Sequence, residues 1–186
     1  MKCKIRCFFM WQLVIEEIIS HVRCINVDEE LVTRFEKYLK EASQIFICGF
    51  GESELVGKAF ASRLQGLHRD VFVITDTIVP AMNNKDVMVA ISGSGDTEPT
   101  LTLTQRAHEI GASILSITSF SDSPLTNVSD LVIEIPGRIK PKTKDYIERR
   151  VSGEYEPLTP FGALFEISTR IFLEGVVVEL ADDGTL

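Results

Sequence analysis

A short turn rich in hydroxyl groups is the part of the sequence best suited to chemistry. The segment Ser92-Gly93-Ser94-Gly95-Asp96-Thr97 follows the apolar stretch Val87 to Ile91 and precedes a stretch of helical character. Small residues let the backbone fold tightly, so that backbone N–H groups and the hydroxyls of Ser92, Ser94 and Thr97 can converge on one anion at a helix N-terminus. We interpret this turn as a phosphate site.

The same six residues also have an ordinary structural explanation. Serine, glycine and aspartate are common in turns, and Asp96 or Thr97 could simply cap the following helix. A companion turn holds Ser119, Ser121 and Ser123, and its Ser123-Pro124 pair equally suits the start of a helix. We favour phosphate for the first turn because three hydroxyls and two glycines fall within six residues at a strand-to-helix junction.

A second turn, Gly49-Phe50-Gly51-Glu52-Ser53-Glu54, also follows an apolar stretch and opens a helix. It begins like the glycine-rich fingerprint of dinucleotide-binding proteins but has Glu54 where that pattern has its third glycine. Glu52 and Glu54 would also face a pyrophosphate with negative charge. We therefore expect no nicotinamide cofactor.

Both turns need a sheet that holds them at one edge. Beyond Ser43, five apolar runs of strand length alternate with helical stretches. The runs are Ile45 to Cys48, Val71 to Ile74, Val87 to Ile91, Ser113 to Ile117 and Leu131 to Ile135, and the helices are expected at about Leu55 to Leu67, Pro99 to Ile110 and Phe161 to Leu180. Continuous apolar runs indicate strands covered on both faces, and interleaved helices provide right-handed crossovers. The sequence therefore predicts an α/β fold with a five-stranded parallel sheet, whose ligands bind at the carboxyl ends of the strands.

Two leading helices precede the first strand. From Trp11 to Val22 apolar residues recur at spacings of three and four, which is typical of an amphipathic helix. Asp28 can cap a second helix that keeps this period until Ala42. Together they carry more apolar surface than we expect one sheet to cover, which favours a subunit interface.

Composition limits the class of protein and its partners. With 186 residues, 45% of them hydrophobic, the chain suits one globular domain. We divide residues 1–186 into leading helices (1–43), core sheet and crossovers (44–137), a charged excursion (138–157) and a C-terminal helix (158–186). With a formal net charge of −8, the protein lacks the positive field that attracts nucleic acids without sequence specificity. We therefore expect no nucleic-acid partner.

Cysteine spacing and hydropathy argue against several other classes. Cys3, Cys7, Cys24 and Cys48 form no CxxC pair and have no histidine at zinc-ligand spacing, so we expect neither a metal site nor a disulfide framework. The apolar stretch Phe8 to Ile15 is short and has no small-residue cleavage site, which disfavours a signal peptide. No run approaches the roughly 20 apolar residues of a membrane-spanning helix. We therefore expect a cytoplasmic protein without a membrane partner.

Four segments together resemble the sugar isomerase (SIS) domain family. They are Gly49 through Ala61, Ala90 through Thr97, Ile117-Thr118-Ser119 with Asp122-Ser123-Pro124-Leu125, and Thr159-Pro160-Phe161-Gly162-Ala163-Leu164-Phe165-Glu166. Within the family the last segment is most similar to 6-phospho-3-hexuloisomerase. The resemblance implies a three-layer flavodoxin-like fold, no metal or cofactor, and homo-oligomers (dimer or tetramer) with active sites near subunit interfaces. It also implies a sugar-phosphate isomerase that interconverts 3-hexulose 6-phosphate and fructose 6-phosphate.

The resemblance also assigns roles to individual residues. That reaction needs a base that takes a proton from one carbon and returns it to the next through an enediol, and Glu166 is the candidate. Burial between Phe165 and Ile167 would raise the pKa of its carboxyl toward neutrality. The alternative is a structural ion pair between Glu166 and Arg170 at i,i+4 spacing. Further contacts to the phosphosugar are expected from Gly51, Ser53 and Ser119, beside the hydroxyls of the serine–glycine turn.

The histidines receive no catalytic role. His108 lies inside a crossover helix and is expected on the surface. The hexuloisomerase pattern has its histidine at the position of Gly66, two residues before His68, so that role is not transferred. His21 could reach a neighbouring subunit's site, although an exposed surface position is the simpler expectation.

The main departure from the family pattern is Glu52, which stands where relatives have arginine in Gly-x-Gly-Arg-Ser-Gly. We expect a cation from the charged excursion to neutralise it. The candidates are Lys142, Lys144, Arg149 and Arg150. Two alternatives remain open: a non-catalytic sugar-phosphate-binding module, and an isomerase of another sugar phosphate such as arabinose 5-phosphate.

Overall fold

The computed structural model describes residues 2–137, 148, 151–153 and 163–182, with side chains from Trp11 onward. Five strands form one parallel sheet in the order β2-β1-β3-β4-β5. They are β1 (Ile45–Gly49), β2 (Val71–Val73), β3 (Val87–Ile91), β4 (Ser113–Thr118) and β5 (Leu131–Glu134). The five-stranded parallel sheet expected from the apolar runs is confirmed.

The strand order reverses beside β1. The chain goes from β1 to β2 on one side and then returns to place β3 on the other, with Ile45 opposite both Val71 and Val87. In an open parallel sheet, ligands bind outside the carboxyl ends of the strands at such a switch point. The turns that follow β1 and β3 both lie there.

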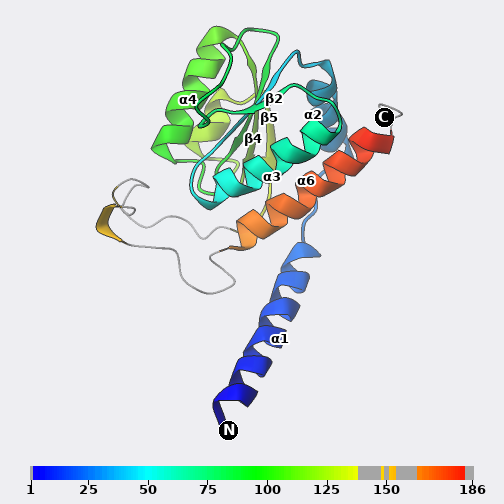
Figure 1. The fold of residues 1–186 in the computed structure, drawn as a ribbon, viewed down its shortest axis with the longest axis vertical. Coiled ribbons are helices and arrows are strands. Elements are labelled where there is room, and N and C mark those ends of the chain that lie inside the picture. Colours follow the sequence, from blue (N-terminus) through cyan, green and yellow to red (C-terminus); the bar gives the residue numbers. More distant parts are fainter. Residues whose placement is uncertain (1, 138–147, 149–150, 154–162, 183–186) are drawn as a thin grey trace.

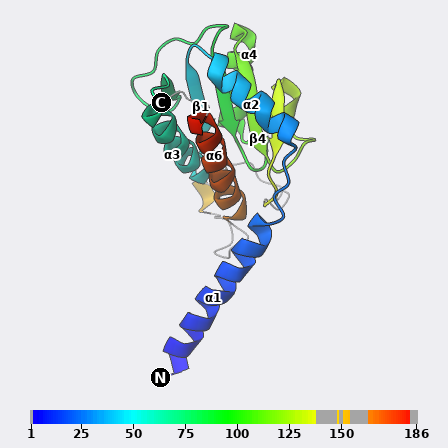
Figure 2. The same ribbon diagram turned by 90° about the vertical axis from the view of Figure 1, so that its right-hand side faces the viewer.

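Helices cover the two faces of the sheet unequally. One face packs against α2 (Glu29–Glu41), α3 (Glu52–Gly66) and α6 (Leu164–Asp182), and Figures 1 and 2 show α3 and α6 side by side on that face. The other face packs against α4 (Glu98–Ile110), with the 3-10 helix η1 (Pro124–Val128) beside it. This gives the three-layer arrangement that the family resemblance implies.

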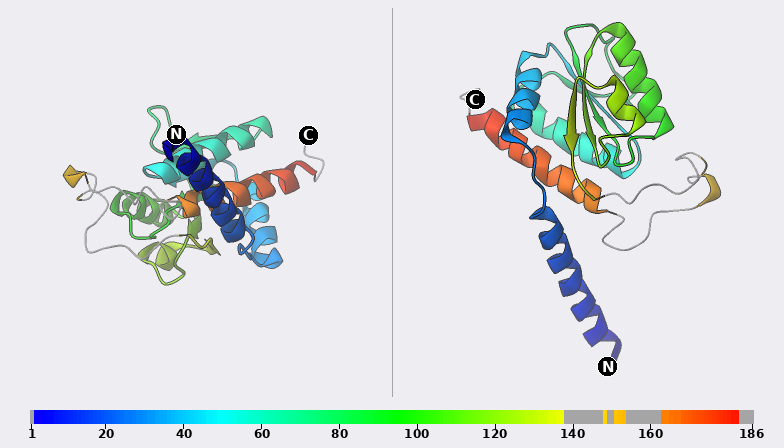
Figure 3. Two further views of the ribbon diagram at one scale, coloured as in Figure 1. Left: turned by 90° about the horizontal axis from the view of Figure 1, so that it is seen from below. Right: turned by 180° about the vertical axis from the view of Figure 1, so that it is seen from behind.

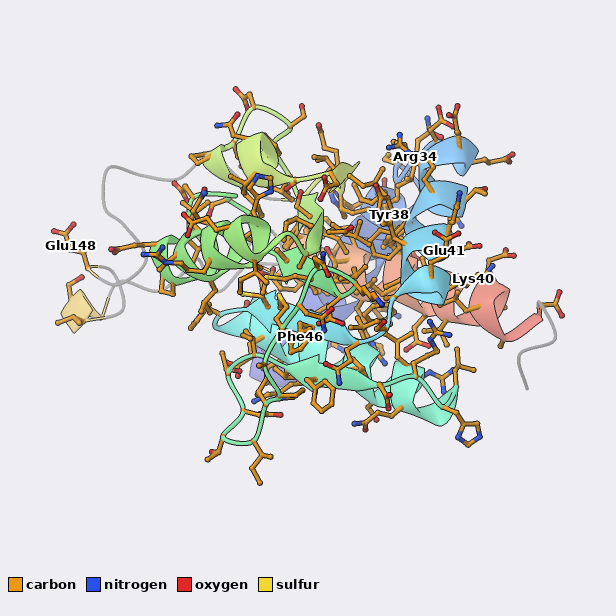
Figure 4. The ribbon with its side chains drawn as sticks, turned by 90° about the horizontal axis from the view of Figure 1, so that it is seen from above. Arg34, Tyr38, Lys40, Glu41, Phe46 and Glu148 are labelled. Carbon is orange, nitrogen blue, oxygen red and sulfur yellow. The ribbon has the colours of Figure 1, made fainter. Side chains whose placement is uncertain are left out.

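Alternate side chains of each strand supply the two cores. In β1, Ile45 and Ile47 face the cluster formed with α2, α3 and α6, whereas Phe46 and Cys48 face the cluster formed with α4. Figure 4 shows Phe46 inside the body of the molecule. Burial on both faces explains why the strands read as continuous apolar runs.

The first helix, α1, runs over Lys2–Val22 and is therefore longer than the Trp11 to Val22 expected from the apolar spacing. Figures 1, 2 and 3 show it extending away from the sheet and its covering helices. Trp11 and Leu13 are about two-thirds exposed, at 63% and 60%. Among the described residues, no helix combines the length and apolar character needed to cross a membrane.

Local signals in the sequence account for most helix ends. Asp28 caps α2 as expected, because its Oδ1 accepts a hydrogen bond from the Glu30 backbone N–H at 2.8 Å. At the C-terminus of α2, the Arg69 guanidinium donates hydrogen bonds to the carbonyls of Leu39 and Lys40. The α3 helix begins at Glu52 rather than near Leu55, since Gly51 with φ 66° occupies its N-cap. Most of the charged excursion, and the start of the expected last helix at Phe161, lie outside the described residues.

Candidate functional site

The serine–glycine turn after β3 gathers its hydroxyl groups at one point. The Ser92 Oγ donates to Thr97 Oγ1 at 3.1 Å, and the Ser94 Oγ lies 3.4 Å from the same oxygen. Backbone N–H groups of Gly95 and Asp96 point to the Ser92 and Ser94 hydroxyls at 3.2 and 3.4 Å. The three hydroxyls that the sequence singled out are therefore adjacent, at the N-terminus of α4.

Capping does not explain this turn. Thr97 is the N-cap residue of α4, yet its side chain accepts no hydrogen bond from the helix backbone and instead accepts one from Ser92. Asp96 is exposed and lies outside the helix. Gly95 adopts φ +65°, and a Cβ at this position would collide with the side chain of Ser123. The turn is thus a specific backbone conformation whose hydroxyls face one another rather than the helix.

Glu166 lies in the first turn of α6 and reaches the N-terminus of α3. The Ser53 Oγ donates to Glu166 Oε1 at 3.3 Å, a contact between residues 113 positions apart. Ser53 is buried, Glu166 is half-buried, and the Glu166 Oε2 atom is shielded from solvent. The two residues that the resemblance linked to catalysis and substrate binding therefore touch each other.

The structural alternative for Glu166 was an ion pair with Arg170. In the structure Arg170 Nη2 contacts Glu174 Oε1 at 2.5 Å, and Glu174 also receives Arg63 Nε from α3 at 3.2 Å. Arg170 therefore belongs to a group of ion pairs that joins α6 to α3, further along the two helices than Glu166. The carboxylate of Glu166 stays near the carboxyl end of the sheet, beside Ser53.

Phe165 connects Glu166 to the serine–glycine turn. Its fully buried ring covers Gly93, where a Cβ would come within 2.8 Å of the ring. Gly162, one turn before Glu166 in the segment that resembles the family, lies outside the described residues. The contact between Phe165 and Gly93 was missed, since no local pattern marks it.

The two glutamates of the turn after β1 differ in their surroundings. Glu54 Oε1 accepts hydrogen bonds from Lys58 Nζ and Thr75 Oγ1, both at 2.8 Å, and these bonds lower the pKa of the Glu54 carboxyl. Lys58 also lies 3.7 Å from Asp76. The spacing of Glu54 and Lys58, at i and i+4, was a readable signal for this pair. Glu52 is exposed, and the cations expected to neutralise it lie outside the described residues.

Two further predicted contacts lie at the same edge of the sheet. Gly51 is the N-cap of α3, next to Ser53. The Ser119 hydroxyl donates to the Ile135 carbonyl at 2.8 Å, and its backbone N–H donates to the Gly93 carbonyl at 3.1 Å. Ser119 thus joins the turn after β3 to β4 and β5, and its predicted contact with substrate stays a prediction.

The histidines lie in three different environments. His108 is exposed, as expected. His68 is exposed at the opposite end of the sheet, where it lines a cavity with Arg69 and Asp70. The expectation of an exposed His21 is wrong: the residue is half-buried, and its Nε2 lies 3.0 Å from the carbonyl of Pro136, two residues after the end of β5.

Other reactive side chains fall outside this site. Cys48 is fully buried in β1, and burial raises the pKa of its thiol to about 12. A thiol with such a pKa is inert at neutral pH. Within the described residues, no cluster of three or more histidine, cysteine, aspartate or glutamate side chains could hold a metal ion.

Comparisons with known proteins identify the family of the chain. The family model for the SIS domain matches residues 38–146, more than half of the chain. An uncharacterized protein from Aeropyrum pernix is 42% identical over 166 residues, which cover 88% of this chain and 78% of that protein. A 3-hexulose-6-phosphate isomerase from Methylomonas aminofaciens is 29% identical over 94% of this chain and 90% of its own length.

Solved structures share the fold. A hypothetical protein from Methanococcus jannaschii, whose crystal structure infers a molecular function of 3-hexulose-6-phosphate isomerase, superposes with a TM-score of 0.71 at 26% identity and covers 91% of this chain and 88% of that one. The NanR protein of Vibrio vulnificus, complexed with ManNAc-6P, has a TM-score of 0.72 at 19% identity, over 96% of this chain and 62% of that one. The chain is therefore a SIS-domain protein of the phosphosugar isomerase family.

Proposed function

We propose that this protein interconverts 3-hexulose 6-phosphate and fructose 6-phosphate. The observation that supports the proposal is the proximity of two groups with complementary tasks. The Ser92, Ser94 and Thr97 hydroxyls form a neutral donor cluster at a helix N-terminus, and Glu166 lies one residue from the ring that packs on the same turn. The named 3-hexulose-6-phosphate isomerase among its relatives supports this substrate over other sugar phosphates.

The serine–glycine turn would hold the phosphate. Hydroxyl and backbone N–H groups donate to phosphate oxygens, and the helix dipole of α4 favours negative charge at this end. The protein as a whole carries a formal net charge of −8, so attraction must come from such local donors. Inorganic phosphate is expected to compete with the sugar phosphate.

Glu166 would move the proton. In 3-hexulose 6-phosphate the carbonyl is at C3; the base removes the proton from C2 while the C3 oxygen gains a proton, which gives an enediol whose double bond joins C2 and C3. The same carboxyl then delivers a proton to C3, the C2 hydroxyl loses its proton, and the carbonyl forms at C2. A carboxylate shielded from water suits both steps, because it keeps the proton from exchanging with solvent between them. Ser53 would orient the carboxylate through its hydrogen bond to Oε1.

The reaction needs no electron acceptor and no Lewis acid in this account, so we propose that it proceeds without a cofactor or metal. We also propose a cytoplasmic homo-oligomer, a dimer or tetramer. The exposed apolar side chains of α1, among them Trp11 and Leu13, support an interface between subunits. Light scattering of the purified protein tests the oligomer.

A second candidate function is a sugar-phosphate-binding module without catalysis. The observation that favours it is Glu52, an exposed carboxylate at the start of α3 where the family pattern has arginine. If an arginine at this position helps relatives to bind substrate, the chain has lost part of the machinery. An isomerase of another sugar phosphate, such as arabinose 5-phosphate, would explain the same departure.

A panel of phosphosugars separates these functions. Purified protein is incubated with fructose 6-phosphate, 3-hexulose 6-phosphate and arabinose 5-phosphate, and isomers are followed by NMR with Glu166→Gln as a matched control. We expect exchange between the two hexulose phosphates only. Binding without any isomer would favour the module, and turnover of arabinose 5-phosphate alone would contradict the proposed substrate.

A further inference from the structure

Phe165 lies between two segments of the candidate site that are far apart in the sequence. On one side its ring covers Gly93 in the serine–glycine turn: a Cβ on Gly93 would lie 2.8 Å from Cδ1, 3.0 Å from Cγ and 3.2 Å from Cε1 of the ring. Three ring atoms at this range mean that the ring lies against the glycine backbone. The side chain of Phe165 is completely buried.

The backbone of Phe165 also meets Gly137, which follows β5. A Cβ on Gly137 would lie 2.5 Å from the Phe165 nitrogen and 2.8 Å from its Cα. No side chain fits between Phe165 and either glycine, so the first turn of α6 packs directly against the backbone at both positions. Close packing of this kind transmits displacements rather than absorbing them.

The serine–glycine turn is itself held on the sheet. The Ser92 backbone N–H donates to the Ile117 carbonyl at 3.0 Å, and the Gly93 carbonyl accepts from the Ser119 backbone N–H at 3.1 Å. Both bonds run to β4 or to the residue directly after it. Since β4 holds the turn and the ring of Phe165 packs on Gly93, the turn constrains the position of the first turn of α6.

We propose that Phe165 is a positioning residue that sets the separation between the phosphate-binding turn and the Glu166 carboxylate. Glu166 is the next residue along α6, and Ser53 fixes the direction of its side chain. This inference rests on the proposed function: a sugar phosphate has a fixed number of bonds between its phosphate and its reacting carbons, so its turnover depends on a matching separation in the protein.

Complementary substitutions test the contact. Gly93→Ala adds a methyl group against the ring and is expected to displace the start of α6. Phe165→Leu removes part of the ring and leaves space above Gly93. In the double variant the added methyl group occupies that space, so part of the activity is expected to return. Gly175→Ala on the same helix is the matched control, because a Cβ there meets no atom within 4 Å.

The expected result is a separation of kcat from phosphate affinity. In Gly93→Ala we expect kcat to fall by about 10- to 100-fold, since an error of about 1 Å in placing a reacting group has costs of this order. The inhibition constant of inorganic phosphate should change by less than about threefold, because the donors of the turn remain. The double variant should recover at least about fivefold in kcat over Gly93→Ala, which is the sign of coupled residues. Equal losses in kcat and phosphate affinity, or a double variant no better than Gly93→Ala, would overturn the proposal.

A binding measurement keeps this test independent of catalysis. Calorimetry compares the affinity for fructose 6-phosphate with that for inorganic phosphate, and the ratio reports how well the sugar reaches the α6 side of the site. We expect the ratio to fall in Gly93→Ala and to stay unchanged in Gly175→Ala. If wild type turns over no phosphosugar but the ratio responds in this way, the isomerase proposal fails and the positioning role stands. A ratio that is equal in both variants, or no binding of fructose 6-phosphate, removes the positioning role.

Discussion

Two strand-to-helix turns lie side by side at the switch point of the sheet, and they differ in how they use their polar residues. The turn after β3 directs Ser92, Ser94 and Thr97 toward one another and contains one exposed aspartate. The turn after β1 contains two glutamates, one paired with Lys58 and one exposed, and contributes Ser53 to Glu166. The hydroxyls after β3 bond to one another and to their own backbone, whereas the Ser53 hydroxyl after β1 bonds to a distant carboxylate, so we propose the phosphate site for the turn after β3 alone.

The largest expected effect comes from placing charge in the turn after β3. Ser94→Asp puts a carboxylate next to the bound phosphate, and like charges at this range repel strongly in a partly buried site. We expect phosphosugar binding to be lost, as measured by calorimetry, while circular dichroism shows a folded protein. Ser121→Asp is the control, because Ser121 is exposed in the companion turn. This variant should bind the phosphosugar normally. Retained affinity in Ser94→Asp would remove this turn from the site.

The next effect concerns Glu166, the proposed base, which Ser53 of the turn after β1 contacts. Glu166→Gln keeps the shape of the side chain and its contact with Ser53 but cannot take up a proton. We expect turnover to fall by at least ~10²-fold and phosphosugar affinity to stay within about tenfold. Steady-state kinetics and calorimetry measure the two quantities. Near-normal turnover would return Glu166 to a structural role.

A smaller effect tests the charge of the turn after β1 directly. A carboxylate at ~4 Å from a phosphate repels it by roughly 1 to 4 kcal/mol, depending on the local dielectric. If Glu52 faces the substrate, Glu52→Arg should tighten phosphosugar binding or raise turnover, and Glu52→Gln should do so to a lesser degree. Titration calorimetry and the isomer assay follow both variants. No change in either quantity would mean that Glu52 lies outside the site.

The smallest effect is on stability, and it concerns the other glutamate of that turn. Hydrogen bonds from Lys58 and Thr75 lower the pKa of Glu54 in the folded state below 4.5. The stabilisation is therefore present above pH 4.5 and is lost as the pH falls through the lowered pKa. We expect Glu54→Gln to reduce the thermal midpoint at pH 7 by only about 1 to 2 °C, since such a surface ion pair contributes little.

Thermal melts at pH 7 and at several values below 4.5 measure this effect. The difference between wild type and Glu54→Gln should shrink as the pH falls, because Glu54 then becomes neutral in both states of the wild type. Glu109→Gln is a comparison on α4, where Arg106 lowers the pKa of an exposed carboxyl far from the site. Phosphosugar binding should be the same in both variants at pH 7. If phosphosugar binding is weaker in Glu54→Gln alone, the ion pair between Glu54 and Lys58 contributes to the shape of the site.

Local patterns in the sequence predicted the fold well. Apolar runs identified all five strands within a residue or two, because burial on both faces leaves few polar positions in a strand. Asp28 marked the start of α2 for the same reason that it caps the helix: its side chain bonds to the Glu30 backbone. The extent of α1 was underestimated, since Lys2, Lys4 and Arg6 interrupt the apolar spacing without ending a helix.

The site was predicted only in parts. Ser92, Ser94 and Thr97 lie within six residues, so their convergence follows from the turn itself. The contact of Ser53 with Glu166 joins two helices whose proximity depends on how both pack on the sheet. In the sequence Gly93 looks like an ordinary turn glycine. Only the fold shows that the ring of Phe165 occupies the space that a side chain at position 93 would need. Long-range packing leaves no periodic signal in the chain, which is why family resemblance was needed to single out Glu166.

A crystal structure of the complex with fructose 6-phosphate tests the central claim most directly. We predict that the phosphate oxygens lie about 3 Å from the hydroxyls of Ser92, Ser94 and Thr97, at hydrogen-bond distance. C2 and C3 of the sugar should then lie within about 3.5 Å of the Glu166 carboxylate, close enough for proton transfer. A phosphate bound elsewhere, for example in the cavity beside Arg69 at the opposite end of the sheet, would contradict the account.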